Sequence, residues 1–211
     1  MTTLLASIET TTGDNPDAAV IWLHGLGADG NDFAAIVPEL DLSNCPPIRF
    51  VFPHAPSMPI TINGGYVMPA WYDILNDALV KQEDEAGIRR SALALEGLIG
   101  RGVQRGIATE RIVLAGFSQG CAMVLHVGLR HPSRLAGIIA LSGYLPLAGQ
   151  LAEQASAANR DTPIFMAHGT ADPMVVLPRA EASRDALRTL GYAVQWHTYP
   201  MQHSLHPREI Q

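Results

Sequence analysis

The chain has 211 residues, of which 47% are hydrophobic and 16% are charged. This length and composition favour a sizeable core over disorder, and we expect one domain over residues 1–211. The net charge of −6 and the lack of any Lys/Arg cluster in the sequence argue against a nucleic-acid partner.

Membrane and secretory signals are missing from the sequence as given. No uncharged apolar stretch approaches the roughly 18 residues of a spanning helix, and the first residues lack a basic start with an apolar run. We therefore expect no stable membrane insertion and a cytoplasmic location. Cys45 and Cys121 lack metal-ligand spacing and are expected to be reduced thiols.

Short apolar runs alternate with longer helical patterns, which predicts a mostly parallel sheet flanked by helices, the α/β class. A run at 3–8 predicts an antiparallel edge strand. Ala18–Leu23 is almost continuously apolar, as in a buried central strand. Further strands are predicted at 48–52, 111–115, 137–141, 163–167 and 193–199, and the last alternates enough to lie near an edge.

Three helices are predicted between these strands. The first covers about 83–104, where apolar residues recur at three- and four-residue spacing and acids occupy the first turn. The second covers 119–129, because Pro132 prevents much extension. The third covers about 179–190 and ends at Gly191, a favourable residue after a helix. This pattern fits many α/β enzymes and says nothing about chemistry.

Residues 111–120 read R-I-V-L-A-G-F-S-Q-G, a strand followed by G-x-S-x-G and then a helical pattern. A serine hydroxyl becomes a useful nucleophile when it is exposed, close to a base and next to oxyanion donors. A sharp strand-to-helix turn presents it in this way, and the helix N-terminus supplies unpaired N–H groups. The segment predicts Ser118 as nucleophile. An ordinary glycine-rich turn is the alternative.

A serine nucleophile in this kind of fold is followed along the chain by an acid and then a histidine, each after a later strand. Asp172 follows the strand at 163–167, and His203 follows the strand at 193–199. The acid would fix the imidazole tautomer and stabilise the imidazolium. Asp161 precedes its strand and Asp185 falls inside a predicted helix, so both are weaker candidates.

Two other histidines compete with His203. His206 lies three residues beyond it and remains an alternative base, whereas His197 lies within the predicted strand. Together the three could suggest metal ligands. They straddle a strand and a loop rather than one helix face, so we expect no metal site.

Two backbone N–H groups are the candidate oxyanion donors. One belongs to Gln119, directly after the nucleophile, and the other comes from the loop after an early strand. That loop, residues 24–30, has glycines on both sides of Leu26, which would let the Leu26 N–H point inward.

Five segments resemble the acyl-protein thioesterases and their bacterial carboxylesterase relatives. They are WLHGLGADG at 22–30, NGGYVMPAWYDI at 63–74, VLAGFSQG at 113–120, HGTADPMV at 168–175 and YPMQH at 199–203.

The resemblance implies an α/β-hydrolase fold without a large lid domain, the same triad and oxyanion donors, and no cofactor. The implied function is a serine esterase acting on carboxylic esters with short to medium acyl chains, and homodimers are frequent among such enzymes. An acyl-protein or lysophospholipid thioesterase is the alternative substrate class, and an inactive binding protein of this fold is the non-enzymatic alternative.

The resemblance also places Met68 and Trp71 beside the site, where they would line the acyl pocket unless they are core residues. Three departures stand out. Gln202 replaces the usual glycine before the histidine, and Cys121 replaces a glycine after the elbow. Relatives continue into a C-terminal helix, whereas this sequence extends eight residues past His203, so we expect that helix to be missing and an apolar surface to be uncovered.

Overall fold

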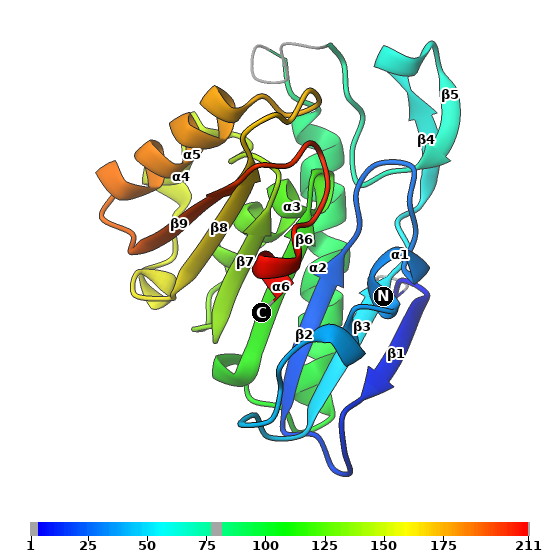
Figure 1. The fold of residues 1–211 in the computed structure, drawn as a ribbon, viewed down its shortest axis with the longest axis vertical. Helices are drawn as coiled ribbons and strands as arrows, with labels where there is room; N and C mark the ends of the chain where they lie inside the picture. The colour runs from blue at the N-terminus through cyan, green and yellow to red at the C-terminus, as the bar shows by residue number, and fades with distance from the viewer. Residues whose placement is uncertain (1–3, 77–81, 211) are drawn as a thin grey trace.

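The computed structural model describes residues 4–76 and 82–210 and centres on a seven-stranded sheet (Figure 1). The strand order is β1-β3-β2-β6-β7-β8-β9, with β1 antiparallel to β3 and every other neighbouring pair parallel. The strands are β1 (Ser7–Thr11), β2 (Ala18–Leu23), β3 (Ile48–Pro53), β6 (Ile112–Phe117), β7 (Gly137–Leu141), β8 (Ile164–Gly169) and β9 (Val194–Tyr199).

The predicted strands all occur in this sheet. β2 and β7 have the predicted bounds, and β9 lies at the edge, as its alternating pattern indicated. The first strand is displaced along the chain relative to the prediction, because β1 runs from Ser7 to Thr11. The N–H of the next residue, Thr12, also donates to Ile48 O. Pairing with β3 determines this position, and the sequence of an edge strand carries little information about its partner. Residue 3 of that prediction lies outside the described residues.

A two-stranded hairpin was missed by the sequence reasoning. β4 (Ser57–Ile60) and β5 (Tyr66–Pro69) pair antiparallel and stand apart from the main sheet (Figure 1). Prolines at positions 59 and 69 weaken the strand pattern. The signal that was available is the Asn-Gly-Gly sequence at 63–65, where Gly64 and Gly65 both have positive φ.

The three predicted helices are present, each within about two residues of its predicted bounds, whereas three short helices at 31–34, 151–154 and 207–210 were not predicted. Asp84 caps α2 by accepting a hydrogen bond from the Gly87 N–H at 2.8 Å, and Gly191 follows α5 with φ +84°. The α-helices are α1 (Asn31–Ala34), α2 (Glu85–Gln104), α3 (Gln119–Gly128), α4 (Leu151–Gln154), α5 (Leu177–Thr189) and α6 (Pro207–Ile210). Single 3₁₀ turns cover residues 37–39, 61–63, 109–111, 148–150 and 157–159. No helix in residues 4–76 and 82–210 is both long and apolar enough to cross a bilayer.

One face of the sheet is covered by helices. Ile21, Leu114 and Ile138 point to this face and pack in one buried cluster with α2 and α3, which include Leu95 and Val124. In Figure 1 these helices lie behind the strands. All ten residues of α3 are buried, so the helix that starts at Ser118 is held rigidly against β6 and β7.

The other face is only partly covered. Trp22, Phe50 and Phe52 point to this face, and Phe33 of α1 stacks on Trp22 with ring centroids 5.4 Å apart. Beside them an apolar groove of about 460 Å³ crosses β2, β3, β6, β7 and β8, with Leu205 and the short α6 at its margin. This groove fits the expectation of an uncovered apolar surface, which stays a prediction; the short α6 at its margin was not expected from the sequence.

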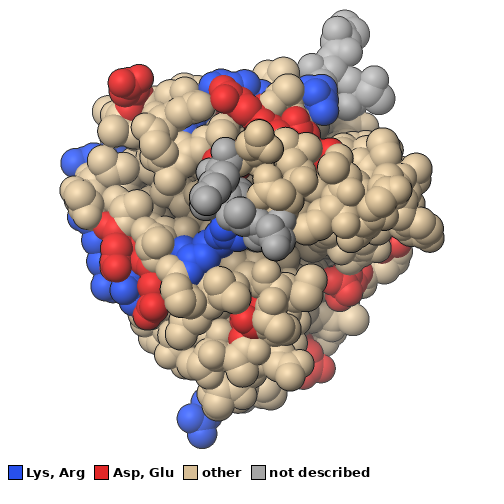
Figure 2. Space-filling view, turned by 90° about the horizontal axis from the view of Figure 1, so that it is seen from above, with Lys and Arg blue, Asp and Glu red and all other residues tan. Residues whose placement is uncertain are grey.

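The carboxyl ends of the parallel strands meet at the upper edge in Figure 1, next to the hairpin. Figure 2 looks onto this end and shows that uncharged side chains cover most of it. In this type of sheet, ligands bind outside the carboxyl ends of the strands. All seven strands belong to one sheet, which is compatible with a single domain over 1–211; that boundary stays a prediction.

Candidate active site

Ser118 occupies the turn between β6 and α3 with φ 56° and ψ −116°, a conformation that L-residues rarely adopt. The glycines on either side of it, Gly116 and Gly120, have no room for a side chain. A Cβ on Gly116 would collide with the Gly120 carbonyl, and a Cβ on Gly120 would collide with the Leu23 carbonyl. The two glycines of the G-x-S-x-G pattern therefore allow the turn at Ser118 to fold tightly and to lie against β2. This turn, the elbow, presents the Ser118 hydroxyl above the sheet.

Ser118, His203 and Asp172 form one hydrogen-bonded chain. His203 Nε2 lies 2.8 Å from Ser118 Oγ, and His203 Nδ1 lies 2.7 Å from Asp172 Oδ2. A carboxylate oxygen can only accept, so the proton belongs on Nδ1 and Nε2 is left to accept from the serine. Asp172 is buried, and its Oδ1 accepts hydrogen bonds from the N–H groups of Met174 (2.8 Å) and Val175 (2.9 Å).

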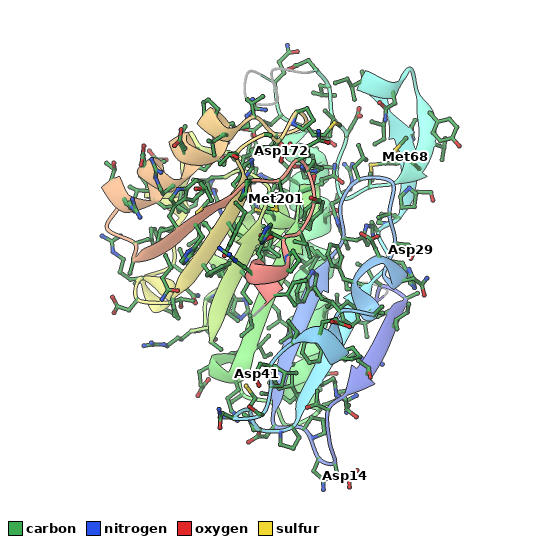
Figure 3. All side chains as sticks on the ribbon, in the orientation of Figure 1. Asp14, Asp29, Asp41, Met68, Asp172 and Met201 are labelled. Atoms are coloured by element: carbon green, nitrogen blue, oxygen red, sulfur yellow. The ribbon has the colours of Figure 1, made fainter. Side chains whose placement is uncertain are left out.

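The loops that carry the acid and the histidine are joined to each other. Thr170 N–H donates to Tyr199 O at 2.9 Å, and Ala171 N–H donates to Met201 O at 3.1 Å. Figure 3 shows Asp172 and Met201 close together beyond the ends of β8 and β9. The Phe117 ring packs against His203 with centroids 4.8 Å apart, which limits rotation of the imidazole.

The competing candidates lie elsewhere. His206 stacks on Tyr199, and its Nδ1 accepts from a backbone N–H rather than reaching Ser118. His197 is exposed on β9, Asp161 is exposed before β8, and Asp185 pairs with an arginine of its own helix. Within the described parts of the chain, no three His, Cys, Asp or Glu residues gather as a metal site.

A second imidazole, that of His168, lies beside Asp172 and was missed by the sequence reasoning. His168 Nε2 donates to Val175 O at 2.7 Å and lies 3.5 Å from Asp172 Oδ2. Burial lowers the pKa of His168, so the ring stays neutral and holds the loop that carries Asp172. Its position four residues before the acid was the only available signal.

The predicted oxyanion donors face the space beside Ser118. Leu26 and Gln119 both line the cavity at the triad, and within the described residues neither backbone N–H has a hydrogen-bond acceptor. A Cβ on Gly25 would lie 3.3 Å from Ser118 Cβ, so the loop passes directly beside Ser118. Two free N–H groups in such a place can stabilise a negative oxygen.

The loop that carries Leu26, residues 24–30, is held by His24. The Ala55 N–H donates to His24 Nε2 at 3.1 Å, so the ring proton is on Nδ1 and donates to Gly25 O at 2.7 Å. Burial lowers the pKa of His24, which keeps this neutral tautomer. The Gly27 N–H adds a bond to Pro69 O at 2.8 Å.

A cavity of about 600 Å³ opens at Ser118 Oγ and His203, with walls that are mainly apolar. Tyr72 and Tyr144 join across it through their hydroxyls, 2.9 Å apart, and burial raises the pKa of Tyr144 to about 12, so both stay protonated at neutral pH. The lining residues are Gly25, Leu26, Ala28, Asp32, Ile62, Asn63, Tyr72, Ile74, Phe117, Ser118, Gln119, Tyr144, Pro173, Met174, Val175, Val176, Arg179 and His203.

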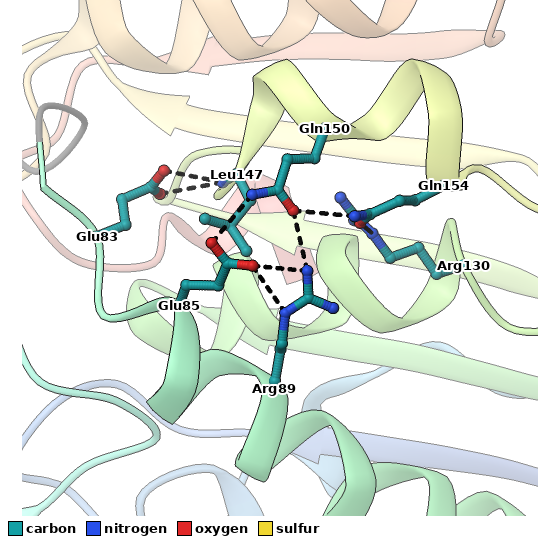
Figure 4. Close-up of polar contacts among 7 residues, drawn as sticks. All are labelled: Glu83, Glu85, Arg89, Arg130, Leu147, Gln150 and Gln154. Atoms are coloured by element: carbon teal, nitrogen blue, oxygen red, sulfur yellow. Dashed lines mark hydrogen bonds and ion pairs between the residues drawn. The ribbon is translucent and has the colours of Figure 1, made fainter.

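Polar contacts fix the start of α2 against the segment that follows Tyr144 (Figure 4). Both carboxylate oxygens of Glu83 accept from the Leu147 N–H, at 3.1 and 3.0 Å, and burial raises the pKa of Glu83. Glu85 accepts from Arg89 and from the Gln150 amide. This network fixes the segment that follows Tyr144, which is one of the lining residues.

The sequence model of the phospholipase/carboxylesterase family matches residues 6–211. The chain belongs to this family. An acyl-protein thioesterase 1 from Neurospora crassa is 46% identical over 196 residues, which are 89% of this chain and 80% of that protein. One from Gibberella zeae is 43% identical over 202 residues, 92% of this chain and 86% of that protein.

Solved structures agree with this assignment. The chain superposes on acyl-protein thioesterase 2 from Zea mays with a TM-score of 0.85 at 27% identity, covering 98% of this chain and 94% of that one. For SOBER1 from Arabidopsis thaliana the TM-score is 0.84 at 30% identity, covering 92% and 93%. The predictions of the family, of the α/β-hydrolase fold and of a serine hydrolase with carboxylesterase or thioesterase chemistry are confirmed.

The family position of Met68 and Trp71 does not make them cavity residues in this structure. Trp71 is fully buried, and its indole N–H donates to His24 O at 2.9 Å. Met68 lies on β5, half-buried, with its sulfur near Gly27 (Figure 3). Neither residue lines the cavity, and Trp71 is a core residue. The apolar wall comes instead from residues such as Ile62 and Val176, which no motif marked.

Two of the departures from the family pattern, Cys121 and Gln202, leave the geometry around Ser118 and His203 intact. Cys121 is buried in the first turn of α3, burial raises the pKa of its thiol, and Cys45 is exposed; neither forms a disulfide. Gln202 is exposed, and its carbonyl packs where a Cβ on Gly169 would be, so the loop before His203 lies close to β8.

Proposed function

We propose that this chain is a serine esterase that hydrolyses carboxylic esters of short to medium acyl chain length. Ser118 is the nucleophile, His203 the general base and Asp172 the acid that orients it. The observation that carries the proposal is the unbroken hydrogen-bonded chain from Asp172 to Ser118 Oγ, which opens into the apolar cavity. The reaction uses these side chains and water, without cofactor or metal.

The reaction has two steps. Ser118 Oγ attacks the ester carbonyl carbon while His203 Nε2 takes the hydroxyl proton, and the oxyanion accepts from the N–H groups of Leu26 and Gln119. The carbon–oxygen bond to the leaving alcohol breaks as His203 returns the proton to that alcohol. Water then attacks the acyl-enzyme with His203 again as base, which releases the acid and restores Ser118.

The shape and chemistry of the cavity support an acyl substrate. Ile62, Met174 and Val176 line it and are 43%, 67% and 52% exposed, so an aliphatic chain would meet apolar surface from the mouth inward. The second candidate is an acyl thioester, favoured by the 46% identity to an acyl-protein thioesterase 1. A thiol leaves from the same tetrahedral intermediate, so one site serves both classes; a cytoplasmic location and a homodimer remain further parts of the proposal.

The test is hydrolysis of p-nitrophenyl acetate, butyrate and octanoate, with fluorophosphonate labelling read by mass spectrometry. We expect turnover and a label on Ser118, with both lost in Ser118→Ala and both retained in the control Ser133→Ala, which alters an exposed serine. A folded protein with neither turnover nor label would contradict the proposal and favour the binding-protein alternative. An acyl-thioester peptide assayed beside the aryl esters decides between the two substrate classes.

A further inference from the structure

Residues 69–72 form a strap between the two sources of oxyanion donors. On one side, Pro69 O accepts from Gly27 N–H at 2.8 Å, and the Trp71 indole N–H donates to His24 O at 2.9 Å. These contacts hold the loop that carries Leu26 from both ends. The rings of His24 and Trp71 also pack together, with centroids 5.2 Å apart.

On the other side, the 69–72 strap is held by the side chain of Gln119. Gln119 Oε1 accepts from the Trp71 N–H at 2.8 Å, and Nε2 donates to Tyr72 O at 2.6 Å. Gln119 is only 3% exposed, and both ends of its side-chain amide are committed to the strap. From α2, Ser91 Oγ donates to Trp71 O and fixes the strap from behind.

The strap matters because sheet pairing stops short of the donors. The β2–β6 ladder ends at the pair Leu23 and Gly116, while the donors belong to Leu26 and Gln119, three residues further along each chain segment. Beyond the ladder, one hydrogen-bonded route between the two segments runs from His24 O to the Trp71 indole N–H, and from the Trp71 backbone N–H to Gln119 Oε1. This route adds to the direct packing of Gly25 on Ser118 and of Gly120 on Leu23 in setting the spacing of the two donor N–H groups.

We propose that Trp71 and the side-chain amide of Gln119 are positioning residues that set the spacing of the oxyanion hole. The inference rests on the proposed esterase function and deepens it. Oxyanion stabilisation requires donors about 2.7–3.1 Å from the charged oxygen, so a small displacement of one donor weakens the transition state more than it weakens substrate binding. The loss of a whole donor costs about 10²–10³ in kcat, and a displaced donor should cost about tenfold.

The first test is Trp71→Phe, which keeps an aromatic ring in the core and removes the N–H that holds His24 O. We expect kcat to fall about tenfold while KM changes less than about twofold. The matched control is Trp22→Phe on the opposite sheet face. Trp22 is also buried, but its indole N–H has no acceptor within the described residues, so kcat should be unchanged.

A second readout separates positioning from simple destabilisation. Fluorophosphonate titration counts the functional serines, so kcat is expressed per labelled Ser118. A trifluoromethyl ketone, which forms an oxyanion on Ser118, should bind Trp71→Phe about tenfold more weakly, in proportion to kcat. Unchanged kcat per labelled site, or unchanged ketone affinity, would overturn the proposal.

A third measurement tests the shared route. Gln119→Leu removes both side-chain contacts with the strap, and its backbone N–H remains. Because both residues act through one link, the double variant with Trp71→Phe should lose no more activity than the worse single variant. Multiplied losses in the double variant would overturn the shared route. If Ser118 of the unaltered, folded protein takes no label, the esterase function itself fails, and that outcome is visible before any variant is compared.

Discussion

Each oxygen of the Asp172 carboxylate has a separate partner. Oδ2 faces His203 Nδ1, while Oδ1 accepts from two N–H groups of its own loop. The two N–H bonds to Oδ1 fix the plane of the carboxylate, and the contact of Oδ2 with His203 fixes the imidazole tautomer. A substitution that keeps the loop contacts and changes only the atom facing His203 isolates the catalytic role of the acid.

Asp172→Asn is that substitution. The Asn oxygen can keep the bonds to Met174 and Val175, so its NH₂ group faces His203 Nδ1, which must then accept, with the proton moved to Nε2. That tautomer cannot take the Ser118 proton, and the same change in a serine protease triad lowers kcat about 10⁴-fold. We expect a loss of about 10³–10⁴ in ester turnover with little change in Tm. Asp185→Asn, on the surface of α5, is the control; a loss of less than tenfold in Asp172→Asn would contradict the proposed role of the acid.

The sequence predicted the residues of the hydrogen-bonded chain because chain order and strand ends determine where they lie. Tyr72 and Tyr144 had no such marker, since their meeting depends on how the segment after β5 packs over α3. Trp71 was associated with the site through its motif, yet the sequence could not show that its contact is with the His24 carbonyl rather than with the cavity. Roles that depend on one hydrogen bond between distant segments need coordinates.

At the scale of elements, β1 depends on a charge cluster. It pairs with the sheet only through β3, and Glu9 in its centre contacts three arginines. Arg49 of β3 lies at 3.0 Å, Arg101 of α2 at 3.3 Å and Arg105 at 2.8 Å. Burial alone would raise the pKa of Glu9, but Arg105, Arg49 and Arg101 outweigh it and the pKa is lowered.

Glu9→Gln should destabilise the chain by about 1–3 kcal/mol at pH 7, because three partly buried arginines lose their anion. A lowered folded pKa means that the carboxylate stabilises the fold above its usual pKa of 4.5 and loses this contribution as pH falls through the folded value. The difference between the two proteins should therefore shrink toward pH 3. Urea unfolding at pH 7, 5 and 3 measures it, with exposed Glu153→Gln as control. Equal stability at pH 7, or a difference independent of pH, would show that the cluster does not anchor β1.

Element predictions succeeded where hydrophobic pattern decides the outcome. β2 is buried on both faces and reads as a continuous apolar run, and α2 has a regular stripe with an acidic start. The β4–β5 hairpin was not predicted because it lies apart from the main sheet and is largely exposed. Tyr66 and Val67 are 68% and 60% exposed. Such a segment is specified by its Gly-Gly turn and by contacts with the rest of the chain, which a pattern of apolar residues does not encode.

For the molecule as a whole, buried imidazoles make stability depend on pH. His24, His126 and His168 are each no more than 3% exposed, and burial lowers the pKa of all three. The shift is largest at His126 in α3, where burial, followed by Arg130 and Arg89, lowers the pKa to about 3. Its Nδ1 has no hydrogen-bond partner within the described residues, and the opposing influence of Glu85 is smaller than the cost of burial.

The consequence is a loss of stability in acid that can be assigned to one side chain. Between its usual pKa of 6.5 and about 3, His126 takes a proton in the unfolded chain and stays neutral in the folded one. The unfolded state then binds one more proton, so the free energy of unfolding should fall by about 1.4 kcal/mol for each pH unit in this window. His126→Gln cannot titrate and should remove this part of the slope, whereas His197→Gln at an exposed position of β9 should leave it unchanged. Urea unfolding from pH 7 to pH 4 provides the measurement. If the His126→Gln variant keeps the full slope, the imidazole is already solvated in the folded protein and the acid sensitivity belongs to His24 and His168.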